Sequence, residues 1–461
     1  MSAADERSFA AGRTGLEVRR IAVRQLVLIL AAVAASILGY VLAAVGVTGS
    51  TPTNVPAFVA MTAGAFLLAH VLTVRLAPGA DPTLLPIAAL LTGIGYAEVF
   101  RVAPSLATEQ FTWLLIGVGF YCLTLALVPD HRRLESLTYT IGLVGIGLLL
   151  LPIVPGVGGL GGYVRNGARL WFRLGPISFQ PAEIGKVLIV IFLASYLNAK
   201  KELLAMATRR IGPVRLPEPR HLAPLAVAWG VSLAILFVEN DLGSSLLFFG
   251  IFVVMLWLAT GRGAYLGLGA AMFAGGAALG YATVPHVQVR VAIWLHALDP
   301  KYVHGTGYQL AQSWFALATG GVSGSGLGLG HPQLIPSSWD DFIFSAIGEE
   351  LGLLGTTALL LLFVLLVARG LRAAVAADDG FSKLLAAGLA AVIAIQTFVI
   401  VGGVTRVIPL TGVTLPFVSY GGSSLVTNFV LLALLVRVSA GARPAGRHRL
   451  GIGPRSASEG G

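Results

Sequence analysis

Apolar runs of about 20 residues recur along the whole chain, and no other feature constrains the fold as strongly. A helix needs about 20 apolar residues to cross the roughly 30 Å hydrocarbon core of a bilayer. Twelve such runs lie between Gln25 and Val438. Because 56% of the residues are hydrophobic and only 11% are charged, the composition excludes a soluble protein. The sequence therefore predicts an all-α polytopic membrane protein with about twelve transmembrane helices.

The charges between the runs predict the side of the membrane on which each loop lies. Cytoplasmic loops collect Lys and Arg, and the net charge of +10 comes mostly from such loops, so we do not expect a nucleic-acid partner. A basic segment, residues 1–24, precedes the first run, and a basic tail, residues 439–461, follows the last. We therefore expect a transmembrane domain over residues 25–438 with both termini in the cytoplasm.

Two loops on the predicted outer side differ from the others. The Gly-rich loop 155–180 holds three arginines and no acid, against the positive-inside rule. Arg grips phosphate oxygens in a planar fork, so Arg169 and Arg173, close to Trp171, suit an anionic substrate, with membrane-lipid phosphates as the alternative. The long loop 285–340 is rich in aromatic residues, and we expect it to fold back onto the membrane face.

Charged residues also mark the outer ends of several runs. Glu183 and Lys186 open the sixth run, three residues apart and therefore on one face of a helix. Next to an apolar run we expect this pair to face a wet cavity. Asp241 lies in a tight turn before the eighth run, where a helix N-cap is the simpler interpretation.

Four acids surround the start of the tenth run. On an ideal helix Glu349 lies about 80° round from Asp341 and about 12 Å deeper, and Glu350 about 180° away, so these acids cannot share one site. Asp341 at the outer rim suits a base that acts on a substrate from outside, and Glu349 suits a supporting role in the helix core. For Asp340 and Asp341 the alternative is again a helix N-cap.

Five segments, in order, carry a family resemblance. They are NGARLWFRLGPISFQPAEIGK, NDLGSS, HGTGYQLAQS, DDFIFSAIGEELGLLG and LPFVSYGGSSL. These segments resemble the motifs of the shape, elongation, division and sporulation (SEDS) family, which includes RodA, FtsW and SpoVE, over roughly residues 166–438. Two of the runs before residue 166 exceed the ten usual in that family.

The resemblance implies an activity and a setting. Members of the family are peptidoglycan glycosyltransferases that polymerise lipid II at the outer face of the bacterial cytoplasmic membrane and work with a class B penicillin-binding protein. The short terminal tails favour a RodA-like elongation enzyme over an FtsW-like division polymerase. A transporter or lipid flippase is the main rival, because twelve spans with both ends inside is a common transporter layout. A scaffold that only recruits the penicillin-binding protein would need no carboxylate at Asp341.

The resemblance also implies roles for individual residues. Asp341 matches the essential acid of the family motif His-Thr-Asp-Phe-Ile-Phe, although Trp339 and Asp340 stand at the His and Thr positions. Glu183 and Lys186 match the family's Gln-Pro-x-Glu-x-x-Lys, and Asp241 matches its Asp-Leu-Gly. The expected substrate-binding residues are Arg169, Trp171, Arg173, Glu183, Lys186, Asp241 and Ser423.

The reaction itself sets requirements for the site. Lipid II presents a sugar carbon bonded to pyrophosphate, so attack by an acceptor 4-hydroxyl needs a base and positive charge at the leaving group. We expect Asp341 to be the base. Arg169, Arg173 and Lys186, with a divalent cation such as Mg²⁺ or Mn²⁺ held by a carboxylate, suit the undecaprenyl diphosphate leaving group. Inversion at the anomeric carbon would turn the α-linked donor into a β-linked glycan. We expect no organic cofactor.

Overall fold

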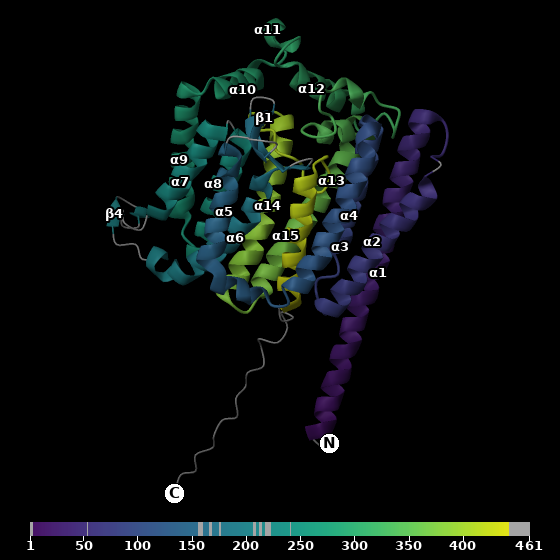
Figure 1. The fold of residues 1–461 in the computed structure, drawn as a ribbon, viewed down its shortest axis with the longest axis vertical. Helices are drawn as coiled ribbons and strands as arrows, with labels where there is room; N and C mark the ends of the chain where they lie inside the picture. Colours follow the sequence, from purple (N-terminus) through teal and green to yellow (C-terminus); the bar gives the residue numbers. More distant parts are fainter. Residues whose placement is uncertain are drawn as a thin grey trace.

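The computed structural model (Figure 1) describes residues 3–441 except 53, 155–159, 166–167, 175–176, 206–208, 212–213, 217–222 and 240. Most of this chain is helical, and the long helices stand side by side in a bundle. The helices are α1 (Ala3–Thr48), α2 (Val55–Leu76), α3 (Leu84–Val102), α4 (Pro104–Leu127), α5 (Thr138–Leu150), α6 (Pro181–Ala205), α7 (Ala223–Ala234), α8 (Leu242–Thr260), α9 (Gly263–Thr283), α10 (Pro285–His296), α11 (Pro300–Val303), α12 (Tyr308–Gly320), α13 (Ile343–Ala376), α14 (Gly380–Val404) and α15 (Gly422–Gly441). The helical membrane fold is therefore confirmed.

The number of spans differs slightly from the prediction. Within the described residues, eleven helical segments are long and apolar enough to cross a membrane, against the twelve apolar runs. The remaining run corresponds to α7, which has 12 residues and continues into a π-helical segment, Ile235–Glu239. A change of helical pitch thus interrupts this run before it reaches the length of the others.

The helices differ in how deeply they lie in the bundle. The most buried spans are α3, α14 and α15. Helices α5 and α9 lie at the periphery and expose large apolar side chains, among them Leu143 and Phe273. An apolar surface of this kind is expected where helices face lipid tails rather than water.

The two ends of the bundle are different. Helices α10, α11 and α12 form an arc across one end, which we call the arc end (Figure 1). The start of α1 and the end of α15 lie at the opposite end. The arc is fastened to the end of α14, because Trp314 Nε1 donates to the Val404 carbonyl at 2.9 Å and Trp294 Nε1 donates to that of Arg406 at 3.0 Å. The segment 285–340 therefore lies folded against the bundle.

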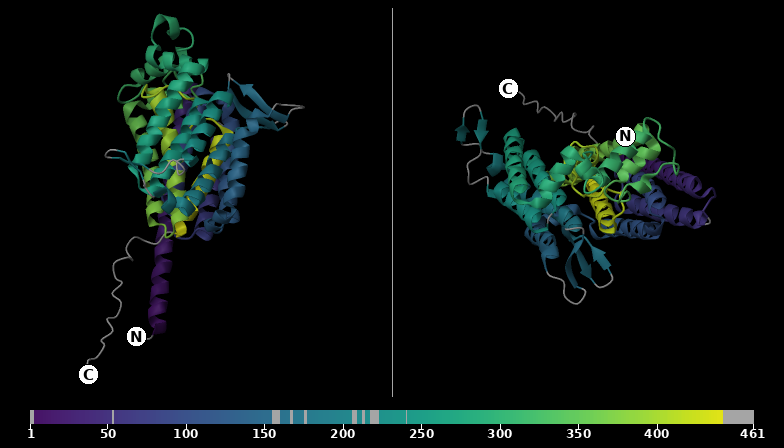
Figure 2. Two further views of the ribbon diagram at one scale, coloured as in Figure 1. Left: turned by 90° about the vertical axis from the view of Figure 1, so that its left-hand side faces the viewer. Right: turned by 90° about the horizontal axis from the view of Figure 1, so that it is seen from above.

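Part of the predicted Gly-rich loop is a small sheet rather than an irregular loop. Strands β1 (Leu160–Arg165), β2 (Ala168–Leu174) and β3 (Ile177–Phe179) pair antiparallel in the order β1-β2-β3. Figure 2 shows this sheet standing out from the side of the bundle. The sequence of β2 alternates Arg169, Trp171 and Arg173 with apolar residues, and this period of two is typical of a strand. A second hairpin pairs β4 (Arg209–Ile211) with β5 (Val214–Leu216).

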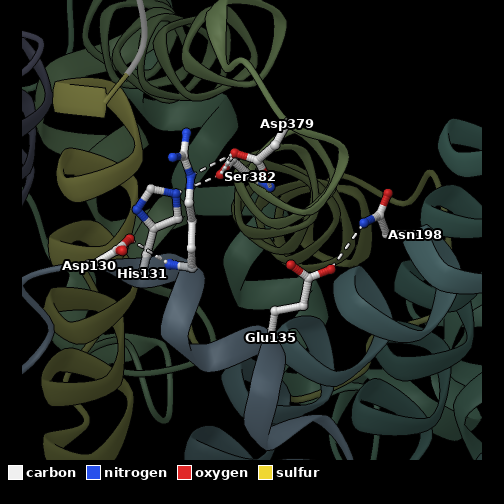
Figure 3. Close-up of polar contacts among 7 residues, drawn as sticks. Asp130, His131, Glu135, Asn198, Asp379 and Ser382 are labelled. Atoms are coloured by element: carbon white, nitrogen blue, oxygen red, sulfur yellow. Dashed lines mark hydrogen bonds and ion pairs between the residues drawn. The ribbon is translucent and has the colours of Figure 1, made fainter.

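Polar contacts fix the turn after α4 to the start of α14 at the end opposite the arc (Figure 3). Arg132 Nε lies 3.0 Å from Asp379 Oδ2, and His131 Nε2 lies 2.6 Å from Ser382 Oγ. Asp379 is the N-cap of α14 and accepts from the Ser382 backbone N–H at 2.8 Å. The acid therefore satisfies a helix end and an arginine from another turn at the same time.

Candidate functional site

Asp341 lies at the arc end in a turn directly before α13. The N-cap position of α13 is Phe342, which is fully buried and leaves the helix without a side-chain cap. The N-cap interpretation of Asp340 and Asp341 is therefore wrong. Asp341 is only partly buried, so its carboxylate is close to water but not fully surrounded by it.

Three segments that are far apart in the chain meet at Asp341. A β-carbon built on Gly412 would lie 3.8 Å from Asp341 Oδ2 and 3.6 Å from Arg290 Nη2. Gly412 has a φ of +76°, a conformation that favours glycine, and it leaves room for both charged groups. The same loop, residues 411–413, packs against Gly243 in the first turn of α8. The loop thus joins Arg290, Asp341 and the start of α8 in one place.

Asp241 is the helix N-cap that its turn predicted. Its Oδ1 accepts from the backbone N–H groups of Gly243 at 2.9 Å and Ser244 at 3.0 Å. Burial raises the pKa of Asp241, while the hydrogen bonds from Ser244 and the nearby Arg290 partly oppose the rise. Asp241 thus combines a structural role with a place in the electrostatic field of the site.

The surroundings of Asp341 give it the acidity expected of a general base. Burial raises the pKa of Asp341 to about 6, Arg290 opposes the rise, and the negative charge of Asp241 adds to it. A carboxyl group with this pKa is largely ionised at neutral pH, yet it binds a proton more strongly than an ordinary aspartate. Such a group can both take up and release a proton near neutrality.

Arg290 is a functional candidate that the sequence did not predict. Helix α10 presents it beside Asp341, where Nε donates to His286 Nε2 at 2.8 Å and Nη1 donates to the Leu410 carbonyl at 2.5 Å. The first contact is an i,i+4 pair on one helix, and the second crosses to the loop that holds Gly412. One sequence signal was available, because Arg290 is the only arginine in the segment 285–340.

Glu183 and Lys186 form a buried link to the same loop. The Lys186 side chain is 1% exposed, and its Nζ donates to Glu183 Oε2 at 2.6 Å and to Gln396 Oε1 at 2.9 Å. Gln396 Nε2 in turn donates to the Thr414 carbonyl at 2.8 Å. The predicted pairing of Glu183 with Lys186 is therefore present, and it ties α6 and α14 to the loop beside Asp341.

The other predicted substrate-binding residues lie on β2 and at the start of α15. Arg173 on β2 is exposed, and its guanidinium lies 4.7 Å from the ring centroid of Tyr163 on β1. Trp171 pairs with Tyr163 across the same two strands, and the Arg169 side chain lies outside the described residues. Ser423 accepts from the Gln180 backbone N–H at 3.0 Å and so fixes the start of α6 to α15.

Glu349 has a structural role, as its depth in the helix predicted. Its Oε1 accepts from the His331 backbone N–H at 2.8 Å, and the neighbouring Glu350 pairs with Arg101 of α3 at 2.9 Å. Both carboxylates hold a turn of the chain against α13. Within the part of the chain that the structure describes, no group of three or more His, Cys, Asp and Glu residues could by itself hold a metal ion.

The fold and this site define a polytopic helical membrane protein with a partly buried carboxylate and an arginine at one end of its bundle. The family model described as "Cell cycle protein", for FtsW, RodA and SpoVE, matches residues 89–443. The chain belongs to this family. Helices α1 and α2 precede the matched region.

Named relatives and solved structures agree with this assignment. The peptidoglycan glycosyltransferase RodA of Mycobacterium tuberculosis (strain ATCC 25618 / H37Rv) is 45% identical, over 81% of each chain. A chain from the study "Structural coordination of polymerization and crosslinking by a peptidoglycan synthase complex" is 29% identical, with a TM-score of 0.61 over 78% of this chain and 97% of its own. The rod shape determining protein RodA of Thermus thermophilus is 27% identical, with a TM-score of 0.54 over 78% and 96%.

Proposed function

We propose that this chain is a peptidoglycan glycosyltransferase of the RodA type, which polymerises lipid II into glycan strands during cell elongation. The observation that carries the proposal is Asp341, a carboxylate with a pKa of about 6 beside Arg290 in a member of this family. The relative that shares 45% identity over 81% of both chains is named for this activity.

In this proposal Asp341 is the general base. Its carboxylate takes the proton from the 4-hydroxyl of the acceptor sugar as that oxygen attacks the anomeric carbon of the donor. The new glycosidic bond forms while the bond from the anomeric carbon to the diphosphate oxygen breaks, and the diphosphate leaves with the electron pair. Attack from the face opposite the leaving group gives inversion. A positioned base of suitable pKa typically contributes a factor of about 10² to 10⁴ to the rate.

Arg290 is the cation best placed for the departing diphosphate. It lies beside Asp341, whereas the Lys186 ammonium is already paired with Glu183 and Gln396. A planar guanidinium suits phosphate oxygens. Arg169 and Arg173 would then bind an outer part of the diphosphate or the lipid phosphates around it.

A divalent cation fits this arrangement only with help from the substrate. Mg²⁺ commonly binds through one or two carboxylates together with substrate phosphates, and Asp241 is the carboxylate that would hold Mg²⁺ or Mn²⁺ here. When bound, the ion would neutralise charge on the diphosphate. Arg290 would remain the protein's own positive group at the leaving oxygen.

The partner and the location follow from the same proposal. A similar chain belongs to a peptidoglycan synthase complex that coordinates polymerization and crosslinking, which supports a class B penicillin-binding protein as partner here. The multi-pass fold supports residence in the bacterial cytoplasmic membrane, with the arc end and Asp341 facing outward. Lipid II flipping and an FtsW-like role in division are the competing functions.

Purified protein incubated with lipid II tests the proposal directly. We expect glycan polymer from the wild-type protein and a loss of about 10²-fold or more in Asp341→Asn, with unchanged folding. Asp340→Asn is the matched control, and it should retain most of the activity. Near wild-type polymerisation by Asp341→Asn would contradict the general-base role. Transfer of lipid II across vesicles without polymer would favour the flippase.

A further inference from the structure

The two helices that precede the family match raise the question of what they do for the site. We propose that α1 positions Asp341 by holding the turn 321–331 against the first part of α13. The proposal rests on the function proposed for Asp341, and it assigns α1 and α2 to the catalytic end of the molecule. Gly46 and Gly328 form the contact between α1 and the turn. We call them positioning residues, because they act on Asp341 through other residues and do not touch the reacting groups.

The backbones of α1 and the turn meet at two glycines. A β-carbon on Gly46 would lie 2.5 Å from the Leu327 carbonyl oxygen and 2.8 Å from Gly328 Cα. In return, a β-carbon on Gly328 would lie 2.8 Å from the Ala43 carbonyl oxygen and 2.8 Å from Gly46 Cα. These neighbours are backbone atoms, which cannot rotate away as a side chain does. The fit therefore requires glycine on both sides.

The outer end of α1 is itself fixed in place. The Tyr40 hydroxyl donates to Asn54 Oδ1 at 2.8 Å, in the turn before α2. The Tyr40 ring lies 4.7 Å from that of Phe58 on α2, and Phe58 stacks on Tyr96 of α3 at 4.6 Å. Three helices therefore hold Gly46 against the turn, and Figure 1 shows the chain after α12 reaching across to them.

The turn is bonded on its other side to a kink in α13. The kink is at Gly352, whose φ of +65° and ψ of −165° are not helical. The backbone N–H groups of Ser325 and Gly326 donate to the carbonyls of Glu349 and Glu350, both at 2.9 Å. Glycine at 352 lets the helix turn outward, and it frees these carbonyls for the turn.

The buried carboxylate of Glu350 completes the connection. Glu350 Oε2 accepts from the Gly328 backbone N–H at 2.8 Å, and Glu350 Oε1 pairs with Arg101 Nε at 2.9 Å. Arg101 Nη2 also donates to the Gly330 carbonyl at 2.7 Å. The same glycine that touches α1 is thus hydrogen-bonded to α13, so a shift of α1 reaches that helix through one residue.

The last step runs along α13 to Asp341. Residues 343–350 are all buried and form about two helical turns, a short and stiff element. Asp341 lies two residues before this element. A displacement of the turn at Glu349 and Glu350 should therefore move Asp341 relative to Arg290. A misplacement of about 1 Å in an active site can cost about 10²-fold in rate.

The test compares two glycines of α1. Gly46→Ala places its new methyl group against the Leu327 carbonyl, whereas in the matched control Gly39→Ala the methyl group meets only Ala97 Cβ, at 3.8 Å. Both changes replace glycine by alanine within one helix, so their effect on helix propensity is similar. Gly328→Ala approaches the same contact from the turn and still reports the link from the turn to Asp341 if a change in α1 prevents folding. At a φ of +79° alanine also strains the turn itself, so the contact with α1 is judged from Gly46→Ala.

Two measurements separate positioning from general damage. Hydrogen exchange reports the turn and residues 341–350 directly, without reference to activity. The pH dependence of polymerisation reports Asp341, because the rate falls on the acid side of the pH–rate profile as Asp341 takes up a proton. We call this part of the profile the acid limb. A loss of folded protein lowers the rate at every pH without moving the acid limb. We expect Gly46→Ala and Gly328→Ala to speed exchange in both segments, lower kcat about tenfold or more and move the acid limb, while Gly39→Ala changes none of these.

Three outcomes decide the matter. Unchanged exchange in Gly46→Ala and Gly328→Ala would overturn the proposal, whatever the activity. Faster exchange with an unmoved acid limb and normal kcat would also overturn it, since the turn would then not position Asp341. If the wild-type protein makes no polymer, the function proposed for Asp341 fails, and unchanged exchange at 341–350 would still overturn the mechanical link on its own evidence.

Discussion

Replacing Arg290 by glutamine should move the acid limb of the pH–rate profile to higher pH. The guanidinium stabilises the ionised carboxylate of Asp341, so its removal leaves burial and the charge of Asp241 to raise the pKa further. Polymerisation requires the ionised base and therefore increases as the pH rises through that pKa. In the wild-type protein we expect this limb at about pH 6.

The geometry sets the size of the shift. The guanidinium of Arg290 and the carboxylate of Asp341 both lie within 4 Å of a β-carbon built on Gly412. The two charges are therefore at most about 7 Å apart. At this distance the Coulomb energy is about 2 kcal/mol for an effective dielectric constant of about 20, and about 0.6 kcal/mol in bulk water. Because Asp341 is partly exposed, we expect an interaction energy between these limits. This energy corresponds to a shift of the acid limb of about 0.5 to 1.5 pH units.

The reverse charge change provides the control. Asp241→Asn removes a negative charge that raises the pKa of Asp341, and asparagine still caps α8. Its acid limb should therefore move to lower pH. Initial rates of lipid II polymerisation between about pH 5 and 8 show both shifts. At pH 6 a shift of one unit lowers the Arg290→Gln rate about fivefold, in addition to the loss at every pH from removing the cation at the leaving group. Limbs that stay in place, or that move in the same direction in both variants, would refute the electrostatic reasoning.

Three further predictions concern the remaining charges of the site. If Arg169 and Arg173 bind the diphosphate, each Lys variant should lose about 1 to 3 kcal/mol of transition-state stabilisation; normal turnover by both would make them lipid contacts. If a divalent cation takes part, EDTA should stop polymerisation and added Mg²⁺ or Mn²⁺ should restore it. Unchanged polymerisation in EDTA would mean that arginine alone neutralises the leaving diphosphate. Lys186→Met should destabilise the protein by about 3 to 5 kcal/mol, because Glu183 stays unpaired, and Glu183→Gln in the same chain should recover much of this in thermal unfolding; equal melting of the single and double variants would contradict it.

Apolar length alone predicts much of the bundle. The runs 55–76 and 84–102 coincide with α2 and α3, since charged or turn-forming residues stop both the apolar run and the helix. The first run, 25–47, predicts only part of α1, which starts at Ala3. Hydropathy marks the segment that lies in lipid. The helix itself continues into water, because its first residues include many Ala, Glu and Arg, which have high helix propensity.

The sheet and the π-helical segment were harder to predict. In β2 the alternation is present, but it extends over only seven residues between glycines, so it is a weak signal beside twelve long apolar runs. The segment Ile235–Glu239 is apolar and helical in pattern, and nothing in its residues distinguishes a π-helical turn from an α-helical one. Such a change of pitch depends on neighbouring elements, which a single sequence does not show.

The residues of the candidate site also fall into those that the sequence predicts and those that it does not. Asp341, Asp241, Glu183 and Lys186 lie in short local motifs, and the motifs identified them. Arg290 joins them only in space, because the loop around Gly412 brings α10 to α13. The separation of Glu349 from Asp341 was predictable, since Glu349 lies about two helical turns into α13 and Asp341 lies in the turn before that helix. Contacts within an element can thus be read from spacing, whereas contacts between elements cannot.

If Arg290 binds the leaving diphosphate beside Asp341, as proposed above, an order of events follows. In the free enzyme its charge holds the pKa of Asp341 below the value that burial alone would give. When the donor diphosphate binds Arg290, that charge is matched and new negative charge arrives nearby, so the pKa of Asp341 should rise and make it a stronger base. The acid limb of kcat reports the substrate complex, and that of kcat/KM reports the free enzyme. The kcat limb should therefore lie at the higher pH, and coincident limbs would show that the diphosphate binds elsewhere.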